Sequence, residues 1–209
     1  MTAPARPVRL YRHPLSGHAH RVQLFLSILG IPAELIDVDL ANGEHKSPEF
    51  LAKNPFGQLP VLEDGDVVLA DSNACLVYLA KRYDDSRSWY PDDPVAAAQV
   101  QRWLSVAAGE LAAGPAAARI IKVRNLPLDY ERAKAVSANL FGILEKILGE
   151  RDFLTGPSPT IADLALYTYT AHAPEGGISL TPYPSIAAWL RRIESLPGFV
   201  PMLKLPAAT

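Results

Sequence analysis

The sequence predicts a small α/β domain over residues 1–83 and an all-helical domain over residues 95–209. In the first part, short apolar runs alternate with segments of helical spacing, whereas every periodic segment of the second part is helical. The polar, proline-bearing stretch 84–94 between them has the composition of a linker. Apolar types make up 49% of the 209 residues, enough to fill packed cores and too many for a disordered chain.

The first three elements form a strand, a helix and a second strand. Residues 8–11 read as a short strand, and residues 35–40 as another. Between them, apolar side chains recur at the i, i+3, i+4 and i+7 positions from Val22 to Leu29, which predicts an amphipathic helix that ends at Gly30. Such a βαβ connection is right-handed in about 98% of cases.

A second helix, a hairpin and a third helix complete the predicted α/β domain. Ser47 followed by Pro48 has the pattern of a helix start, with a hydroxyl cap and a proline at the first helical position. Residues 59–63 and 67–70 read as strands around the turn 64–66, and residues 74–82 as the helix after them. The order is therefore β-α-β-α-β-β-α.

The second domain contains four predicted helices. They span residues 95–118, 130–148, 160–172 and 185–195. Each is identified by apolar residues that recur at helical spacing, clearest in the 130–148 segment.

Charge and residue usage exclude several functions. Lys and Arg number 20 and Asp and Glu 22, a formal net charge of −2 that predicts neither a nucleic-acid partner nor an acidic membrane surface. The single cysteine, Cys75, cannot form an internal disulfide, and the histidines lie in no HExxH motif, so we expect no metal site. The apolar run 22–31 is too short to span a membrane, and the first residues lack the apolar core of a signal peptide. These observations predict a soluble cytoplasmic protein.

Ser16 lies where the first strand gives way to the first helix. One interpretation is a helix N-cap, for which serine is a preferred residue. A second uses the same geometry, because free N–H groups and the positive dipole end make a helix N-terminus an anion site. A hydroxyl there can donate a hydrogen bond to a bound thiolate and lower the pKa of a ligand thiol by about one to two units.

Leu59-Pro60 heads the third strand, where a proline cannot serve a central ladder. Although a trans bond is the usual state of an X–Pro pair, a cis bond here would turn the N–H and C=O of Leu59 toward a peptide-like ligand. Gln58 would add a side-chain contact.

Two polar pairs have a structural and a binding interpretation each. Asp71-Ser72 opens the third helix as a cap, or binds the α-ammonium and α-carboxylate of an amino-acid ligand. His45-Lys46 is a solvated pair, or neutralises a terminal carboxylate at the far end of that ligand.

Taken together, these motifs resemble the cytosolic glutathione transferases, in particular their phi- and theta-like bacterial members. The similarity extends over essentially the whole chain. It is densest in GEHKSPEF (43–50), NPFGQLP (54–60), DGD (64–66) and DS (71–72), with Pro14-x-Ser16 and Arg21-Val22 at the spacing of a serine motif. The resemblance implies a thioredoxin-like first domain and a helical second domain.

The resemblance implies that Ser16 activates the thiol of glutathione, the co-substrate, for attack on a hydrophobic electrophile. The residues implied to bind glutathione are His45 and Lys46 for the glycyl carboxylate, Gln58, Leu59 and cis Pro60 for the cysteinyl part, and Asp71 and Ser72 for the γ-glutamyl end. It also implies a homodimer. We expect the electrophile pocket around Leu15, Trp103 and Val106.

Other residues have open or secondary roles. Tyr11 is an alternative to Ser16, since other classes use a tyrosine at the end of the first strand, but its place ahead of an intact Pro-x-Ser motif favours packing. His18 is expected either to contact the thiolate or to line the cleft, and Phe56 either to insert into a partner subunit or to pack locally. Thr160 and Asp163 resemble the capping box of the family, a folding element.

Two other functions remain compatible with the sequence. One is a glutathione-dependent disulfide oxidoreductase or peroxidase, in which the reactive sulfurs belong to the substrate. The other is a binding or scaffold protein that has kept the fold without catalysis, against which the intact Ser16, Asp71 and Ser72 argue.

Overall fold

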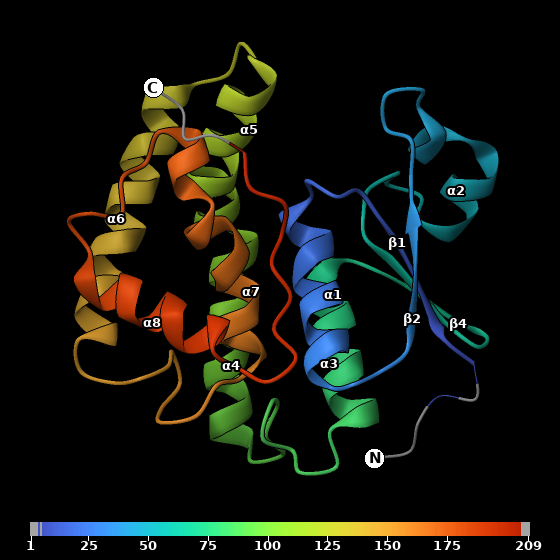
Figure 1. The fold of residues 1–209 in the computed structure, drawn as a ribbon, viewed down its shortest axis with the longest axis horizontal. Helices are drawn as coiled ribbons and strands as arrows, with labels where there is room; N and C mark the ends of the chain where they lie inside the picture. The colour runs from blue at the N-terminus through green and yellow to red at the C-terminus, as the bar shows by residue number, and fades with distance from the viewer. Residues whose placement is uncertain (1–3, 5, 206–209) are drawn as a thin grey trace. The chain divides into compact units, whose positions relative to one another are not determined.

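The computed structural model describes residue 4 and residues 6–205 of the chain (Figure 1). Contacts between residues divide it into two compact units. Of the described residues, those up to Tyr90 and Leu196–Leu203 form the first unit, and Pro91–Ser195 with Lys204 and Leu205 form the second.

A four-stranded mixed sheet forms the centre of the first unit. Its strands are β1 (Val8–Arg12), β2 (Ala33–Asp37), β3 (Val61–Asp64) and β4 (Val67–Ala70), in the order β2-β1-β3-β4. β1 pairs with β2 in parallel and with β3 antiparallel, so Leu10 lies opposite both Leu35 and Leu62. β3 and β4 form the predicted hairpin.

Helices cover both faces of this sheet. In Figure 1, α1 (Gly17–Ile28) and α3 (Ser72–Tyr83) lie on one face and α2 (Pro48–Lys53) on the other. Alternate residues of β1 explain this arrangement, because successive strand side chains point to opposite faces. Leu10 is fully buried in the core, whereas Tyr11 packs with Val38, Phe50 and Val61 under α2.

The predicted second strand, residues 35–40, is displaced in the structure to Ala33–Asp37. This strand is at the edge of the sheet and is mostly exposed, so its pairing is made by the backbone and leaves little apolar pattern in the sequence. Val38, which the prediction included, is buried but lies beyond the end of β2.

A C-terminal segment packs within the first unit, although it follows the last helix of the chain. The ring nitrogen Nε2 of buried His20 is hydrogen-bonded to the carbonyl of Val200 at 2.9 Å. Gly198 has φ +81°, and a Cβ at this position would meet the Ser27 carbonyl at 2.7 Å. The close approach therefore requires glycine. Sequence periodicity gives no indication of this contact.

The second unit is helical. Its α-helices are α4 (Pro94–Ala108), α5 (Ala117–Arg124), α6 (Tyr130–Leu148), α7 (Ile161–Ala171) and α8 (Pro184–Glu194). The helix expected over 95–118 was wrong in extent: α4 ends at Ala108, a π-helical turn spans Ala112–Ala116, and α5 continues to Arg124. Pro115 lies inside the π-helical turn, where it lacks the N–H that a regular helix needs.

Asp163 forms the predicted capping box at the start of α7. This buried carboxylate accepts hydrogen bonds from the Thr160 N–H at 2.9 Å, the Leu154 N–H at 3.0 Å and Trp189 Nε1 at 2.9 Å. It therefore joins the loop before α7 to α8 as well as capping the helix. Its role is structural, as the sequence predicted.

Glu175 is the centre of a second buried polar cluster in this unit. One of its oxygens accepts from Arg119 Nε at 2.6 Å, and the other lies 2.6 Å from His172 Nδ1. The latter oxygen also accepts the N–H of Leu205 at 3.0 Å, so the end of the described chain is fixed to this cluster.

One continuous helical run of the described chain, residues 94–124, has the length and apolar composition of a membrane span. Half of its most apolar window is buried inside the fold, and its regular helix is interrupted between Ala108 and Ala117. Both features are typical of a core helix in a folded domain.

Candidate active site

Ser16 is the N-cap of α1, and the cap uses only the acceptor side of its hydroxyl. Its Oγ accepts the Ala19 N–H at 3.3 Å, which confirms the capping interpretation. As a hydroxyl, it still has a hydrogen to donate, and no acceptor for it lies in the described part of the chain. The N–H of Gly17, the first helical residue, makes no backbone hydrogen bond with any described residue. Both donors remain for an anion.

Two adjoining cavities lie beside this helix end within the first unit. The larger, of about 420 Å³, is lined by His18, Asn54, Pro55, Phe56, Gln58, Leu59, Pro60, Ala70, Asp71 and Ser72. The smaller, of about 290 Å³, is lined by Ser16, His18, Leu40, His45, Gly57, Gln58 and Leu59. His18, Gln58 and Leu59 line both. Together they form one cleft, with Ser16 and His45 in one part and Asp71 and Ser72 in the other.

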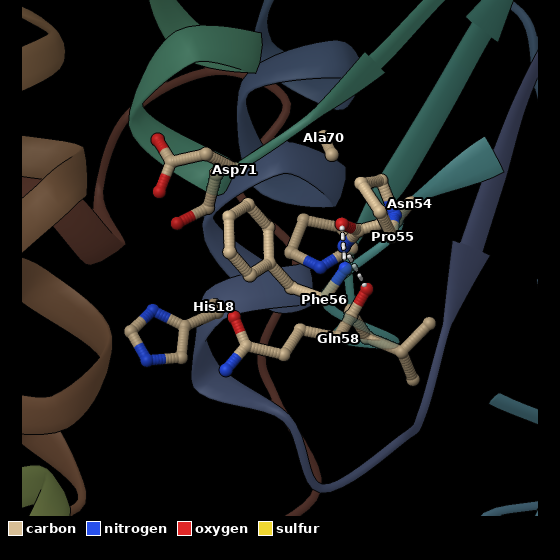
Figure 2. Close-up of a pocket in the computed structure, with 10 residues that line it drawn as sticks. His18, Asn54, Pro55, Phe56, Gln58, Ala70 and Asp71 are labelled. Atoms are coloured by element: carbon tan, nitrogen blue, oxygen red, sulfur yellow. Dashed lines mark hydrogen bonds between the residues drawn. The ribbon is translucent and has the colours of Figure 1, made fainter. Parts of the chain in front are cut away.

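Buried Asn54 shapes the loop that crosses this cleft. Its Nδ2 donates to the carbonyl of Gln58 at 2.8 Å, and its Oδ1 accepts the Phe56 N–H at 3.1 Å (Figure 2). Lys46 Nζ reaches the same loop and donates to the carbonyls of Phe56 and Gly57, both at 3.1 Å. Gly57 has φ +57°, and an added Cβ would meet the His45 carbonyl at 2.7 Å. The loop is thus fixed on both sides.

The Leu59-Pro60 peptide bond is cis, as the family resemblance implied. Neither the N–H nor the C=O of Leu59 takes part in a hydrogen bond with any residue that the structure describes. Since Leu59 lines both cavities, one donor and one acceptor are available there for the backbone of a peptide-like ligand.

Asp71 caps α3 with only one of its two carboxylate oxygens. Its Oδ1 accepts the N–H groups of Asn73 and Ala74, both at 2.9 Å. The other oxygen, Oδ2, has no hydrogen bond to a described residue and remains for a cation. Asp71 has φ +72°, a conformation that side-chain-bearing residues rarely adopt and that recurs at functional sites.

Arg21 positions Ser72, the residue that follows Asp71, by a hydrogen bond to its hydroxyl. This buried guanidinium donates from Nη1 to Ser72 Oγ at 3.3 Å and to Asn73 Oδ1 at 2.9 Å. Ser72 itself is buried, so its position in the wall of the cavity is fixed. From the sequence, Arg21 was recognisable only as part of the serine motif, without a role of its own.

The structure separates the predicted His45-Lys46 pair. His45 lines the smaller cavity, and its Nδ1 is buried with no hydrogen-bond partner in the described structure. Lys46 lines neither cavity, and its ammonium holds the loop carbonyls instead. Of the two, His45 has the polar atom that a ligand carboxylate can satisfy.

His18 is a neutral side chain in the cleft. Burial, followed by the nearby Arg21 cation, lowers the pKa of His18 from 6.5 to about 3. In the view of Figure 2, His18 and Gln58 lie below the Phe56 ring and Asp71 lies above it. Phe56 lines the larger cavity and is 75% exposed.

Tyr11, the alternative to Ser16, has a packing role. Its ring meets Phe50 edge-on with centroids 6.3 Å apart, and its hydroxyl donates to Glu63 Oε2 at 3.2 Å. It lines neither cavity. Cys75 is also outside the cleft, and burial raises the pKa of its thiol to about 12, so it is unreactive near neutral pH.

The residues predicted for the electrophile are not brought into the cleft. Leu15 is half-buried beside Ser16, and Trp103 and Val106 lie on α4 of the second unit, buried and half-buried. None of the three lines either cavity. In the described chain, no group of three or more His, Cys, Asp or Glu side chains is arranged to hold a metal ion.

Asn54 is the one cleft residue with a clear structural task that sequence reasoning did not single out. Its signal was the Asn-Pro pair at 54–55, which marks a turn. The pair does not reveal that the Asn54 side chain organises the following four residues, because those contacts depend on how the loop folds back.

A four-stranded mixed sheet flanked by α1, α3 and α2, with a cis proline before β3 and a cavity lined by both Leu59 and the start of α1, defines a thioredoxin-like domain. Comparisons with known sequences agree. The models of the glutathione S-transferase N-terminal and C-terminal domains match residues 6–81 and 125–197.

Full-length relatives and solved structures extend this match. Human glutathione S-transferase theta-2 is 35% identical over 204 residues, which cover 91% of this chain and 82% of that protein. A glutathione S-transferase structure from Pseudomonas fluorescens Pf-5 has a TM-score of 0.87 at 35% identity, covering 95% of this chain and all of the other. A glutathione transferase homologue from Drosophila mojavensis, described with bound glutathione, has a TM-score of 0.80 at 30% identity and covers 91% of this chain and 89% of its own. The chain therefore belongs to the glutathione S-transferase family.

Proposed function

We propose that this protein is a glutathione S-transferase that joins the thiolate of glutathione to hydrophobic electrophiles. The observation that carries the proposal is the Ser16 hydroxyl at the start of α1. It keeps a hydrogen to donate, in a cleft where the Leu59 peptide groups also lack partners.

The contacts support a division of the cleft among the parts of glutathione. Asp71 Oδ2 and the Ser72 hydroxyl suit the ammonium and carboxylate of the γ-glutamyl end. The N–H and C=O of Leu59 suit the backbone of the cysteinyl residue, with Gln58 beside it. His45 Nδ1 suits the glycyl carboxylate, and Lys46 contributes by holding the loop and by its positive charge.

Ionisation of the thiol is the chemical task of the site. A free thiol has a pKa near about 8.5, so little thiolate exists at neutral pH. A hydrogen bond to a charged acceptor contributes about 1.5–3 kcal/mol and a helix dipole about 0.3–1 kcal/mol, which together lower the thiol pKa by about one to three units. The proton leaves to solvent. The sulfur electron pair then forms the C–S bond while the leaving group departs with its own electron pair.

Binding and turnover test the proposal separately. Titration calorimetry is expected to show glutathione binding to the wild type, and an aryl halide assay to show conjugation. A protein that binds glutathione, reduces a model disulfide and leaves the aryl halide intact would instead be an oxidoreductase. Absence of binding heat would indicate a scaffold protein and refute the proposal.

We also propose that the protein acts in the cytoplasm as a homodimer, as the resemblance implied. Phe56 supports this, because a phenylalanine side chain 75% exposed on a loop suits insertion into a partner. Sedimentation of the wild type and of Phe56→Ser would test it. We expect a dimer for the wild type and a shift toward monomer for the variant.

The electrophile pocket is a further prediction, to which Leu15, Trp103 and Val106 are expected to contribute. A substrate panel on alanine variants of these residues would test it.

A further inference from the structure

We infer that His18 is a second catalytic residue, which donates a hydrogen bond from its imidazole to the sulfur of bound glutathione beside Ser16. The inference rests on the proposed glutathione site and assigns the residue whose role the sequence left open. It gives the thiolate two side-chain donors.

The two cavities locate His18 opposite the middle of the tripeptide. The γ-glutamyl end is assigned to the larger cavity, at Asp71, and the glycyl end to the smaller one, at His45. The cysteinyl residue joins these ends, so it must lie where the cavities adjoin. The residues that line both cavities are His18, Gln58 and Leu59. Leu59 offers backbone groups, which leaves the side chains of His18 and Gln58 to meet the cysteinyl side chain.

The position of His18 on α1 brings it close to the Ser16 donor. It is the second residue of the helix that Ser16 caps, and both residues line the smaller cavity. A sulfur that receives the Ser16 hydrogen therefore lies in the cavity that the imidazole also faces. Figure 2 draws the imidazole and the Gln58 side chain on the same side of the Phe56 ring, and both residues line the larger cavity.

The charge state of His18 determines which kind of help it gives. With its pKa lowered to about 3, the imidazole is neutral at neutral pH and carries one N–H. An imidazole with so low a pKa is a poor acceptor for the thiol proton. His18 therefore acts as a hydrogen-bond donor to the thiolate, and the thiol proton still leaves to solvent.

Two substitutions distinguish three possible roles of His18: a hydrogen-bond donor, a side chain that only lines the cavity, and a base that accepts the thiol proton. His18→Leu introduces an apolar side chain of similar size that has no hydrogen-bond donor. His18→Gln supplies N–H donors on an amide, which does not act as a base for the thiol proton. We expect His18→Leu to raise the thiol pKa of bound glutathione by about one unit and to lower kcat near pH 6.5 about ten-fold. Glutathione affinity should change less than about three-fold. We expect His18→Gln to restore most of both losses.

The measurement is the ultraviolet absorbance of the thiolate, titrated against pH in each complex, together with kcat and calorimetric affinity. His20→Gln is the matched control, since His20 lies on the same helix, is buried away from both cavities and bonds Val200. It should lower thermal stability and leave the thiol pKa unchanged.

Each of the other possible outcomes contradicts either the role of His18 or the proposed function. An unchanged thiol pKa in His18→Leu, with Ser16→Ala raising it, refutes the role of His18 and leaves the proposed function intact. Equal losses in His18→Leu and His18→Gln refute the donor role in favour of proton transfer. A wild type that does not bind glutathione refutes the proposed function and this inference together.

Discussion

Replacing Ser16 by alanine removes two interactions at once. The hydroxyl caps α1 by accepting the Ala19 N–H, and it donates to the thiolate in the proposed complex. The loss of the cap weakens the fold, whereas the loss of the donor weakens the chemistry. Because the two losses appear in different measurements, one substitution tests both interpretations of this residue.

The expected magnitudes follow from the contacts. Loss of a serine N-cap costs about 1 kcal/mol of folding stability. Loss of a hydrogen bond to a charged acceptor costs about 1.5–3 kcal/mol, which raises the thiol pKa of bound glutathione by about one to two units. The helix dipole remains, so the thiol pKa stays slightly below that of free glutathione. We expect conjugation near pH 6.5 to fall ten-fold or more while glutathione still binds.

Ser47 supplies a matched control within the same unit. It caps α2 by accepting the Phe50 N–H at 3.2 Å, close to the 3.3 Å contact of Ser16, but lines neither cavity. Ser47→Ala should lose similar stability in chemical denaturation and keep the wild-type thiol pKa. Ser16→Asp should keep the cap, since aspartate is a preferred N-cap, and lose conjugation because a carboxylate cannot donate.

A Ser16→Ala variant that loses the same stability as Ser47→Ala yet retains the wild-type thiol pKa and turnover would contradict the donor role of Ser16. Ser16 would then be only a helix cap. If His18→Leu carried the whole effect instead, the imidazole would be the principal donor.

Three further predictions concern the scaffold. Gly57→Ala should cost about 1–3 kcal/mol in denaturation and weaken glutathione binding in calorimetry, because its positive φ and the His45 carbonyl both oppose a side chain. Glu175→Gln should cost about 3–5 kcal/mol, since it removes the buried carboxylate that pairs with Arg119; an unchanged melting temperature would contradict this. Gly198→Ala should expose the 196–203 segment to proteolysis, because its Cβ would meet the Ser27 carbonyl.

The ionisable groups of the Glu175 cluster also determine how the folding stability of the second unit changes with pH. Burial alone would raise the pKa of Glu175, but hydrogen bonds from Leu205, His172 and Arg119 hold it below 4.5. A depressed carboxylate pKa stabilises the fold above pH 4.5 and ceases to do so as the pH falls through the folded value. Burial lowers the pKa of His172 below 6.5, so the unfolded chain binds its proton first and stability declines below pH 6.5. Both contributions make the second unit less stable in acid, and a melting temperature that rises from pH 7 to pH 4 would contradict them.

Elements whose signal lies in local chemistry were predictable from the sequence. Helix starts at Ser16, Ser47 and Thr160 were identified because a hydroxyl cap acts on the next few residues, which are fixed by spacing alone. The hairpin around Gly65 followed in the same way, from its turn residues between two short apolar runs. The cis Leu59-Pro60 bond was implied only by the family resemblance, because a trans bond is the usual state of an X–Pro pair.

Features that depend on distant parts of the chain were not predictable. The edge strand β2 was displaced because its backbone pairing imposes no side-chain pattern. The run through Pro115 was read as regular helix because apolar spacing does not register a local change to a π-helical turn. The contact of Val200 with His20 joins residues 180 positions apart, and neither has a local signature.

The sequence left each cap at the cleft with two competing interpretations, and the atoms explain why both can hold. A side chain that caps a helix uses acceptor capacity, whereas activation of a thiol needs a donor and binding of an ammonium needs a second acceptor. Ser16 accepts with its lone pair and keeps its hydrogen, and Asp71 accepts with Oδ1 and keeps Oδ2. The cap also orients the remaining hydrogen or oxygen, because it fixes the side chain against the helix end. Alanine at either position would therefore remove a ligand contact and the element that positions it, while Asn at position 71 would keep the cap and replace the anionic oxygen by an amide. The affinity of Asp71→Asn for glutathione, measured beside its unchanged stability, isolates the charge from the cap.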